Sequence, residues 1–287
     1  MKRFNKVAII GVGLIGGSIG LAVKKRNLAK EVIGIFRRRS TLNKALKRKA
    51  VDSGTLNIEA GTRDADLIIL ATPVFLIPRL AREALKYAKD GAIMTDVGST
   101  KAWITAGIEK DLGQHRTISF VGSHPMAGSE RAGVESARDD LLEGSPCIVT
   151  KTARTDKDAM AKVVKFWKAL GAKVTVMDPV RHDMTVALVS HLPHIVAFSL
   201  AGAVPEGALQ YAAEGFGDVT RVASSDPVLW AEIFLTNRRE VARSCREFEK
   251  YYTKMLSAIS GDNLPAMIGL LKTAKYKRDK FNHGKYA

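Results

Sequence analysis

Short apolar runs alternate with amphipathic stretches through the first 180 residues. Residues 14–26, the segment from Ser40 and residues 156–170 have helical periodicity. Continuous apolar runs, which are typical of strands buried on both faces of a parallel sheet, occur at 6–10, 32–36, 67–72, 92–97, 118–122, 147–150 and 173–177. This alternation predicts an α/β domain with a mostly parallel sheet covered by helices on both faces.

The pattern changes after Asp178-Pro179. Strand patterns end, and apolar residues recur with helical spacing over 183–203, 227–257 and 264–276. We therefore predict an α/β domain over residues 1–180 and an all-helical domain over residues 181–287. A helical domain of about a hundred residues with so many apolar positions often completes its core against a second copy, which predicts a homodimer.

Composition favours a soluble globular protein, with 46% hydrophobic and 26% charged residues. No apolar run is expected to reach the length of a membrane span, and the N-terminal residues lead into a strand without a secretory signal. The two cysteines, Cys147 and Cys245, lie far apart and outside any metal-ligand spacing. We expect two buried thiols, no metal site and a cytoplasmic location.

The formal net charge of +16 has two interpretations. Lysine and arginine can neutralise nucleic-acid phosphates, or they can form a solvated basic surface that attracts anionic small molecules. The charge gathers at 24–49 and 272–285, where neither interleaved aromatic residues nor a zinc-finger pattern occurs. We therefore favour a small anionic substrate over a nucleic-acid partner.

A glycine loop follows the first predicted strand and opens the first predicted helix. In this context Gly11 permits a tight turn, Gly13 lets the backbone approach a pyrophosphate, and Gly16 allows close helix–strand packing. The helix N-terminus adds free N–H groups and a positive dipole end. The loop predicts a Rossmann-type domain that binds a nicotinamide dinucleotide through Gly11, Gly13, Leu14, Ile15 and Gly16.

The end of the second strand predicts which dinucleotide is bound. An NAD site has an acidic residue there that bonds the ribose hydroxyls, whereas this chain has Phe36 followed by three arginines, Ser40 and Thr41. Guanidinium and hydroxyl groups suit a 2′-phosphate. We predict NADP in preference to NAD, held by Arg37, Arg38 and Thr41; the alternative is a solvated basic surface.

Three further segments place polar residues among apolar ones: 95–101, 121–130 and 190–194. Together with the glycine loop and Ala71-Thr72-Pro73, they occur in an order that resembles the prephenate and arogenate dehydrogenases of tyrosine biosynthesis. The motifs that carry this resemblance are Asp96-Val-Gly-Ser-Thr-Lys101, Gly122-Ser-His-Pro-Met-Ala-Gly128 and Ser190-His-Leu-Pro-His194. The resemblance covers nearly the whole chain and suggests the short monofunctional form.

The resemblance implies oxidative decarboxylation of a cyclohexadienyl substrate, with hydride transfer to the nicotinamide, giving tyrosine or 4-hydroxyphenylpyruvate. It implies cofactor contacts at Thr72 and Pro73. His124 is the candidate proton acceptor, because a neutral imidazole can take the hydroxyl proton; the alternative is a structural histidine. Ser99 would orient that hydroxyl or His124, or cap a helix. By resemblance, His194 reaches the substrate, and His191 is interpreted as structural.

The substrate carboxylates require cations. The resemblance carries over an arginine that binds a carboxylate and a tryptophan nine residues on, which are Arg221 and Trp230 here; their alternatives are a surface salt bridge and helix packing. Glu130, a possible gate on Arg221, and Ser123 complete the candidate substrate contacts. Asp96 is expected to anchor its loop, and His182 and Asp183 are interpreted as structural residues at the domain junction.

Two alternatives from other classes stay open. A β-hydroxyacid dehydrogenase or an imine reductase shares the glycine loop and the helical second domain, but not the two histidine motifs. A non-catalytic dinucleotide- or nucleic-acid-binding protein would account for the charge. Within the family, the sequence leaves prephenate and arogenate undecided, because they differ only in a keto group against an ammonium.

Overall fold

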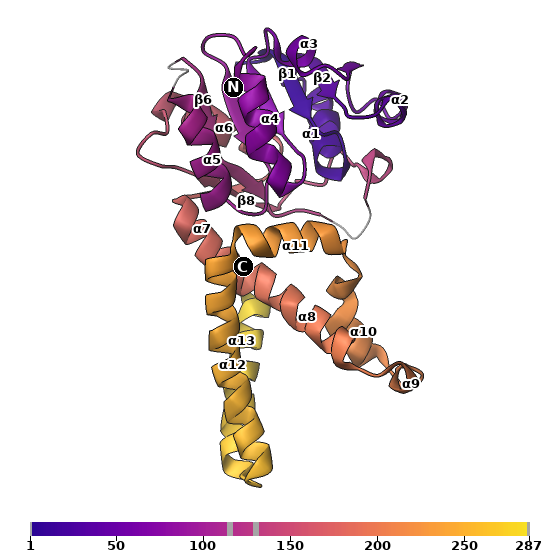
Figure 1. Cartoon of the computed structure of the whole chain (residues 1–287), viewed down its shortest axis with the longest axis vertical. Coiled ribbons are helices and arrows are strands. Elements are labelled where there is room, and N and C mark those ends of the chain that lie inside the picture. The colour runs from indigo at the N-terminus through magenta and orange to yellow at the C-terminus, as the bar shows by residue number, and fades with distance from the viewer. Residues whose placement is uncertain (1, 114–116, 129–131, 286–287) are drawn as a thin grey trace. The chain divides into compact units, whose positions relative to one another are not determined.

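The computed structural model describes residues 2–113, 117–128 and 132–285, and the side chains of these residues up to 281. The chain forms two compact units, Met1–Arg238 and Arg239–Ala287, which are described separately (Figure 1). The strands and the residues of the predicted site up to Trp230 belong to the first unit.

The first unit is built on a six-stranded parallel sheet with strand order β3-β2-β1-β4-β5-β6. The chain winds outward from β1 to β3 and then returns to the other side of β1 for β4. Ligands bind in such sheets at the carboxyl ends of the strands where the order reverses. The strands are β1 (Phe4–Ile10), β2 (Ala29–Ile35), β3 (Ser53–Thr55), β4 (Leu67–Leu70), β5 (Ile93–Asp96) and β6 (Ser119–Val121).

Helices cover both faces of this sheet, so its central strands are apolar on both sides. Along β1, Val7 and Ile9 enter one core cluster, while Ala8 and Ile10 enter the other. This confirms the interpretation of the runs at 6–10, 32–36, 67–72, 92–97 and 118–122 as strands of a buried parallel sheet, whereas the strand at 173–177 is largely exposed. The helical segments of this part are α1 (Leu14–Lys25), α2 (Arg39–Lys47), α3 (Ile58–Thr62), η1 (Val74–Leu76), α4 (Ile77–Leu85), α5 (Ala102–Leu112), η2 (Val134–Ser136) and α6 (Lys157–Ala169).

A second, three-stranded sheet has the order β7-β8-β9, with β7 (Ser123–Pro125) antiparallel to β8 (Pro146–Thr150) and β8 parallel to β9 (Lys173–Met177). The prediction of a single sheet was therefore wrong. Gly122 alone separates β6 from β7, and a Cβ there would lie 2.5 Å from Thr150 Oγ1. The close approach lets the chain leave one sheet and enter the other, and it carries His124 to the sheet edge.

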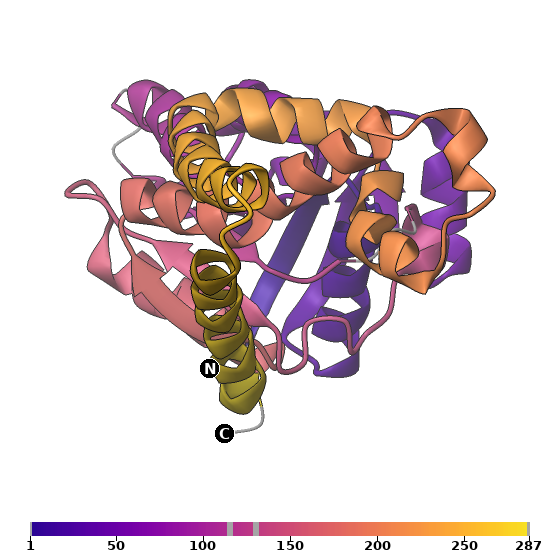
Figure 2. The ribbon, with the colours of Figure 1, turned by 90° about the horizontal axis from the view of Figure 1, so that it is seen from below.

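The rest of the first unit is helical, as predicted after Asp178. Its segments are α7 (Pro179–Val186), the π-helical η3 (Ala187–His191), α8 (Leu192–Ala203), α9 (Glu206–Leu209), α10 (Glu214–Thr220), η4 (Arg221–Ser224) and α11 (Pro227–Thr236). α10 packs beside α8, and α11 packs on η1 of the α/β part (Figures 1 and 2). Glu232 of α11 accepts a hydrogen bond from the Phe75 backbone N–H at 3.2 Å.

The continuous helix Pro179–Ala203 is 25 residues long and apolar enough to cross a membrane. The expectation that no apolar run reaches this length was therefore wrong. Length and composition are weak evidence for a span, because core helices of soluble proteins meet the same criteria. Only 22% of its most apolar window is buried, so much of the apolar surface of this helix is exposed among the described residues.

The second unit contains most of α12 (Arg238–Ser260) and all of α13 (Leu264–Lys285). Tyr251 of α12 donates its hydroxyl hydrogen bond to the Leu270 carbonyl of α13 at 2.7 Å. The sequence predicted one helix over 227–257, but the chain breaks at Asn237 between α11 and α12. The reason is tertiary: the Asn237 amide is held by Asp183 and His191, as described below.

Candidate active site

The glycine loop joins β1 to α1 at the point where the strand order reverses. Gly11 has a φ of +92°, and a Cβ there would lie 2.5 Å from the Ala71 carbonyl oxygen, while one at Gly16 would lie 2.1 Å from the Gly11 carbonyl oxygen. At Gly13, by contrast, nothing lies within 4 Å of such an atom. Two glycines are thus required by packing, and the third leaves an open backbone surface at the helix N-terminus.

The surroundings of the loop fit a dinucleotide. Leu14 and Ile15 form the first turn of α1, whose N-cap residue, Gly13, provides no side-chain hydrogen bond, so the first N–H groups face outward for an anion. Thr72, next to Gly11 at the end of β4, has a buried hydroxyl without a partner among the described residues. Pro73 follows as the N-cap of η1. An unpartnered polar atom beside an open backbone surface is what a bound ligand would satisfy.

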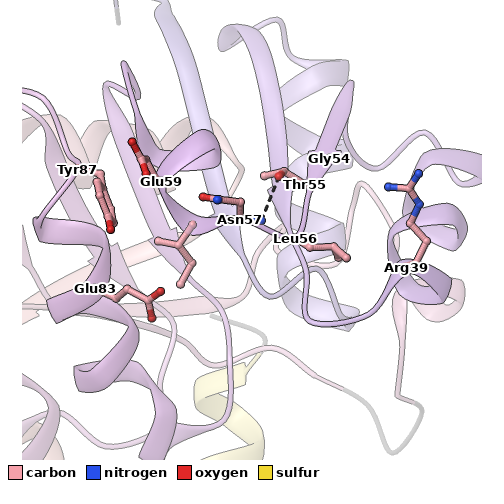
Figure 3. A pocket seen from close by; sticks show the side chains of 9 residues that line it. Arg39, Gly54, Thr55, Leu56, Asn57, Glu59, Glu83 and Tyr87 are labelled. Carbon is pink, nitrogen blue, oxygen red and sulfur yellow. Dashed lines mark hydrogen bonds between the residues drawn. The ribbon is translucent and has the colours of Figure 1, made fainter.

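The segment after β2 is exposed and basic. Arg37, Arg38 and Thr41 are all solvent-accessible, and the Thr41 hydroxyl donates to the Arg38 carbonyl at 2.8 Å. In the described part of the chain, the guanidinium groups of Arg37 and Arg38 make no hydrogen bond or ion pair. The next residue, Arg39, lines a cavity of about 610 Å³, with Glu83 of α4 and Tyr87, just after that helix, on its other side (Figure 3). The surface beside the arginines is therefore concave.

The histidine of β7 belongs to a buried chain of three side chains. His124 Nδ1 lies 2.8 Å from His182 Nε2, and His182 Nδ1 lies 2.8 Å from Asp183 Oδ1. The two imidazole rings meet edge to face, with centroids 5.0 Å apart. His182 and Asp183 come from α7, so the start of the helical region reaches back to the edge of the second sheet.

Asp183 also forms the N-terminal cap of α5. Its two carboxylate oxygens accept the backbone N–H groups of Lys101 at 2.7 Å and Ala102 at 2.9 Å. A helix cap is usually a side chain just before the helix, and the sequence offered Ser99 for that role. α5 begins at Ala102, however, and Ser99 lies free of the cap on the partly exposed loop after β5. Its hydroxyl therefore stays available for a ligand.

A fully buried ion pair holds the loops together. Lys101 Nζ pairs with Asp96 and also donates to the Ser123 carbonyl at 2.7 Å, and both charged side chains have no exposed surface. Asp96 in turn accepts the N–H groups of Gly98 and Ser123. Burial raises the pKa of Asp96 and lowers that of Lys101, while their mutual attraction opposes both shifts. Asp96 anchors its loop, as expected, but the partner lysine was not singled out.

The Ser123 hydroxyl is used inside the protein. Trp167 Nε1 donates to it at 2.9 Å, and Thr95 Oγ1 lies 2.9 Å from it. Because successive residues of a strand point to opposite sides, Ser123 faces the core while His124 faces the other way. The expected substrate contact at Ser123 is thus replaced by a structural role, since its oxygen is already shared by two buried groups.

His194 and Trp230 lie together within one chain. Their rings stack with centroids 3.4 Å apart, and His194 Nδ1 lies 2.9 Å from the Ser190 carbonyl oxygen. Arg221 is exposed but near enough for its charge to lower the pKa of His194, after the larger effect of burial. These three predicted residues are therefore neighbours. Glu130 lies outside the described residues.

The neighbouring histidine, His191, is buried and partly satisfied. Asn237 Nδ2 lies 3.2 Å from His191 Nδ1 and also donates to the Asp183 carbonyl at 2.9 Å. The other ring nitrogen, Nε2, has no partner within the described residues. Burial lowers the pKa of His191 to about 4. The π-helical turn at 187–191 places His191 and His194 near Trp230, and such turns are frequent at functional sites.

Burial sets the charge of the site. It lowers the pKa of His124 well below its ordinary value of 6.5, with the positive charge of Lys101 acting in the same direction, and it lowers that of His182 to about 2. Both rings are neutral near pH 7 as a result. Cys147, on β8, has a pKa raised by burial to about 12 and is unreactive, whereas Cys245 is only partly buried, contrary to expectation.

Comparison with known proteins identifies the family. A sequence profile described as "Prephenate dehydrogenase, nucleotide-binding domain" matches residues 19–176, and one described as "Prephenate dehydrogenase, dimerization domain" matches residues 178–273. The prephenate dehydrogenase of Bacillus subtilis (strain 168) is 34% identical over 285 residues, which cover 96% of this chain and 76% of the relative. The chain belongs to the prephenate dehydrogenase family.

Other family members differ in their named substrates. The cyclohexadienyl dehydrogenase of Zymomonas mobilis is 32% identical over 92% of this chain and 91% of its own length. Prephenate dehydrogenase from Aquifex aeolicus, solved with hydroxyphenyl propionate and NAD+, has a TM-score of 0.89 and 33% identity, covering 96% of this chain and 98% of that one. Synechocystis arogenate dehydrogenase has a TM-score of 0.82 and 29% identity, covering 96% and 99%.

The family assignment confirms the resemblance read from the motifs, and the Rossmann-like domain followed by a helical one confirms the predicted fold class. Sequence reasoning did not single out Lys101 or Asn237, and it interpreted His182 and Asp183 as structural only. One local pattern could have pointed to Lys101: it lies in the short polar loop that follows the buried strand β5, two residues after Ser99. Asn237 gave none, because its contacts join segments 46 and 54 residues apart.

The buried ion pair yields a prediction about stability. Lys101→Met leaves the Asp96 carboxylate buried without its cation, and we expect the free energy of unfolding to fall by about 3–5 kcal/mol. Denaturant unfolding would measure this. Lys44→Met is the control, because it removes an exposed pair with Glu135 and should cost at most about 1 kcal/mol. Equal effects of the two substitutions would show that the buried pair does not hold the loops.

Proposed function

We propose that this protein catalyses the oxidative decarboxylation of a cyclohexadienyl substrate, arogenate or prephenate, with NADP as the preferred hydride acceptor. The proposal is carried by the presence of three features in one member of the prephenate dehydrogenase family: the open glycine loop, the neutral buried His124, and the His194–Trp230–Arg221 group. The bound nicotinamide would accept the hydride from the ring carbon that bears the hydroxyl group.

His124 takes the hydroxyl proton in this proposal. Its depressed pKa keeps the ring in the neutral, proton-accepting form. When the ring carboxylate leaves as carbon dioxide, the electrons of the broken C–C bond enter the ring and place negative charge on the oxygen. The protonated His124 stabilises that oxygen and returns the proton, so that a phenol forms. Ser99 orients the hydroxyl from the neighbouring loop.

The cations nearby suit the rest of the substrate. Arg221 is exposed beside His194 and Trp230, and a guanidinium can bind a carboxylate with two parallel hydrogen bonds. Trp230 stacks on His194 and excludes water from that face of the ring.

The segment after β2 supports NADP as the preferred cofactor. The chain has no carboxylate from Phe36 to Thr41, and Arg37 and Arg38 are exposed with their guanidinium groups unpaired in the described structure. A 2′-phosphate can be bound by such groups, whereas an acidic residue would repel it. The NAD+ bound in the Aquifex aeolicus structure belongs to that protein.

Loss of His124 should abolish most of the turnover. His124→Asn removes the proton acceptor, and we expect kcat to fall by about 10²–10⁴-fold with a smaller change in KM. For the unmodified protein, the acid limb of the pH profile of kcat/KM should lie below pH 6.5, because burial lowers the pKa of His124 and preserves its neutral form to lower pH. Steady-state rates from pH 4 to 9 would check both points. Turnover near that of the unmodified protein in His124→Asn would exclude this role.

The substrate and cofactor can be tested in one set of assays. Arogenate and prephenate, each with NAD and NADP, should give product with at least one substrate, and kcat/KM should be higher with NADP. Arg37→Ala should lower kcat/KM for NADP by about tenfold or more while changing that for NAD little, since one lost charged hydrogen bond costs about 1.5–3 kcal/mol. Lys30→Ala, at the opposite end of β2, is the control. Higher efficiency with NAD in the unmodified protein would reject the NADP preference.

We also propose that the protein is a homodimer joined through its helical region, as the match to a dimerization domain suggests. The exposed apolar side chains of the long helix support this, with Leu188 55% and Val189 63% exposed in the single chain. Apolar surface of this extent on a soluble protein usually marks an interface.

Light scattering would test the dimer. We expect twice the chain mass of 31.2 kDa at micromolar concentration. Val189→Glu should shift the protein toward the single-chain mass, because an unpaired charge buried in an interface is strongly unfavourable. Lys47→Glu on α2 changes charge outside the helical region and should leave the mass unchanged. A single-chain mass for the unmodified protein would contradict the proposal.

A further inference from the structure

The contacts of His124 determine which of its ring nitrogens can act as a base. A neutral imidazole carries one N–H and one lone pair, so a histidine that must accept a proton needs its lone pair directed at the substrate. His124 Nδ1 is engaged with His182 at 2.8 Å, which leaves Nε2 as the only nitrogen that can face a ligand. Nε2 of His124 holds the lone pair only if His182 Nε2 accepts, rather than donates, the hydrogen bond to His124 Nδ1.

The contacts of Asp183, the last side chain in this series, determine which nitrogen of His182 carries the hydrogen. Asp183 accepts the backbone N–H groups of Lys101 and Ala102, one on each carboxylate oxygen. These donors cannot change roles, so they favour the carboxylate form, although burial by itself raises the pKa of Asp183. A carboxylate only accepts hydrogen bonds. The proton between Asp183 and His182 therefore belongs to His182 Nδ1.

The positions of the hydrogens on His182 and His124 follow from this. His182 is neutral, because burial lowers its pKa to about 2, and its single N–H is already placed on Nδ1. Its Nε2 must then accept, so His124 Nδ1 donates. His124 Nε2 is left with the lone pair. A reversed set of roles, starting from a protonated Asp183, would place a hydrogen on His124 Nε2 and make it unable to accept a proton.

The same contacts also respond to the charge that the reaction creates. After His124 accepts a proton, its Nδ1–H becomes a donor on a cation, and such hydrogen bonds are shorter and about twice as strong as neutral ones. His182 stays neutral, and the Asp183 carboxylate supplies the balancing charge. Among the described residues, the other ionisable groups whose charge acts on these rings are Lys101 before α5 and His191 on the π-helical turn.

We propose that His182 and Asp183 are positioning residues for the reaction, which act by holding His124 in the tautomer with a bare Nε2. This inference rests on the proposed role of His124 and revises the expectation that both residues are merely structural. The buried geometry carries it: two contacts of 2.8 Å join three side chains in series, and the last of them is fixed by two backbone donors.

The first test reads the tautomer directly and needs no turnover. Nitrogen-15 spectra of the imidazole rings, assigned to His124 by comparison with His124→Asn, should show at neutral pH a protonated Nδ1 and an unprotonated Nε2. The opposite tautomer in the unmodified protein would overturn the inference even if the protein is an active dehydrogenase. If the protein lacks dehydrogenase activity but shows the expected tautomer, the proposed function fails and the assignment of roles stands.

The second test uses a matched pair of substitutions at His182. In His182→Gln the amide N–H can donate to Asp183 and its oxygen can accept from His124, so we expect kcat within about tenfold of the unmodified protein. His182→Phe keeps a ring but neither polar atom, and kcat should fall by about 10²-fold or more while KM changes little, as expected when only the general base is impaired. Equal kcat values for the two variants would reject the role of His182.

Asp183→Ala addresses the other end. It removes the oxygen that His182 Nδ1 shares with the Lys101 N–H, and also the acceptor of the Ala102 N–H. His182 then no longer has a fixed tautomer, so kcat should fall by about 10²-fold or more and a hydrogen should appear on His124 Nε2 in part of the molecules. Asp156→Ala, which removes the side-chain cap of α6, is the control for helix capping and should leave kcat unchanged. Full kcat in Asp183→Ala would overturn the proposal.

Discussion

The carboxylate of Asp183 is the contact on which the candidate site depends. It accepts the N–H groups that open α5 and the N–H of the neighbouring His182. Helix N-termini need such acceptors, and here the acceptor comes from a helix about 80 residues further along the chain. The loop that carries Ser99 and the strand that carries His124 are therefore aligned by the same side chain, and the helical region begins as part of the candidate site.

A second constraint is the burial of charge. Lys101 and Asp96 have no contact with solvent, and each is compensated by the other and by backbone groups. A buried pair of this kind contributes little net stability, but either member is costly when left alone. Its positive end also faces the histidines, which are kept neutral by burial and by that charge together. The buried ion pair that holds the loops thus also helps to keep His124 in the neutral form, which can accept a proton.

Local patterns predicted most of the α/β fold. Residues 6–10 and 67–72 were recognised as strands because both of their faces are buried, which makes the run continuously apolar. β7 was missed because Ser-His-Pro carries no apolar pattern, and its strand conformation comes from pairing with β8. The break at Asn237 was missed for a related reason, since its amide is held by residues from another helix.

The sequence by itself determined the glycine loop, the order of the motifs and the family, because these depend on residue types at short spacing, and it proposed His124 as the candidate base. Only the tertiary structure decided that Ser123 faces the core, that Trp230 stacks on His194 within one chain, and that Asp183 caps α5. The physical reason is that hydrogen-bond roles depend on partners. A ring nitrogen of His124 is donor or acceptor according to His182 and Asp183, 58 and 59 positions away, and no local pattern encodes that contact.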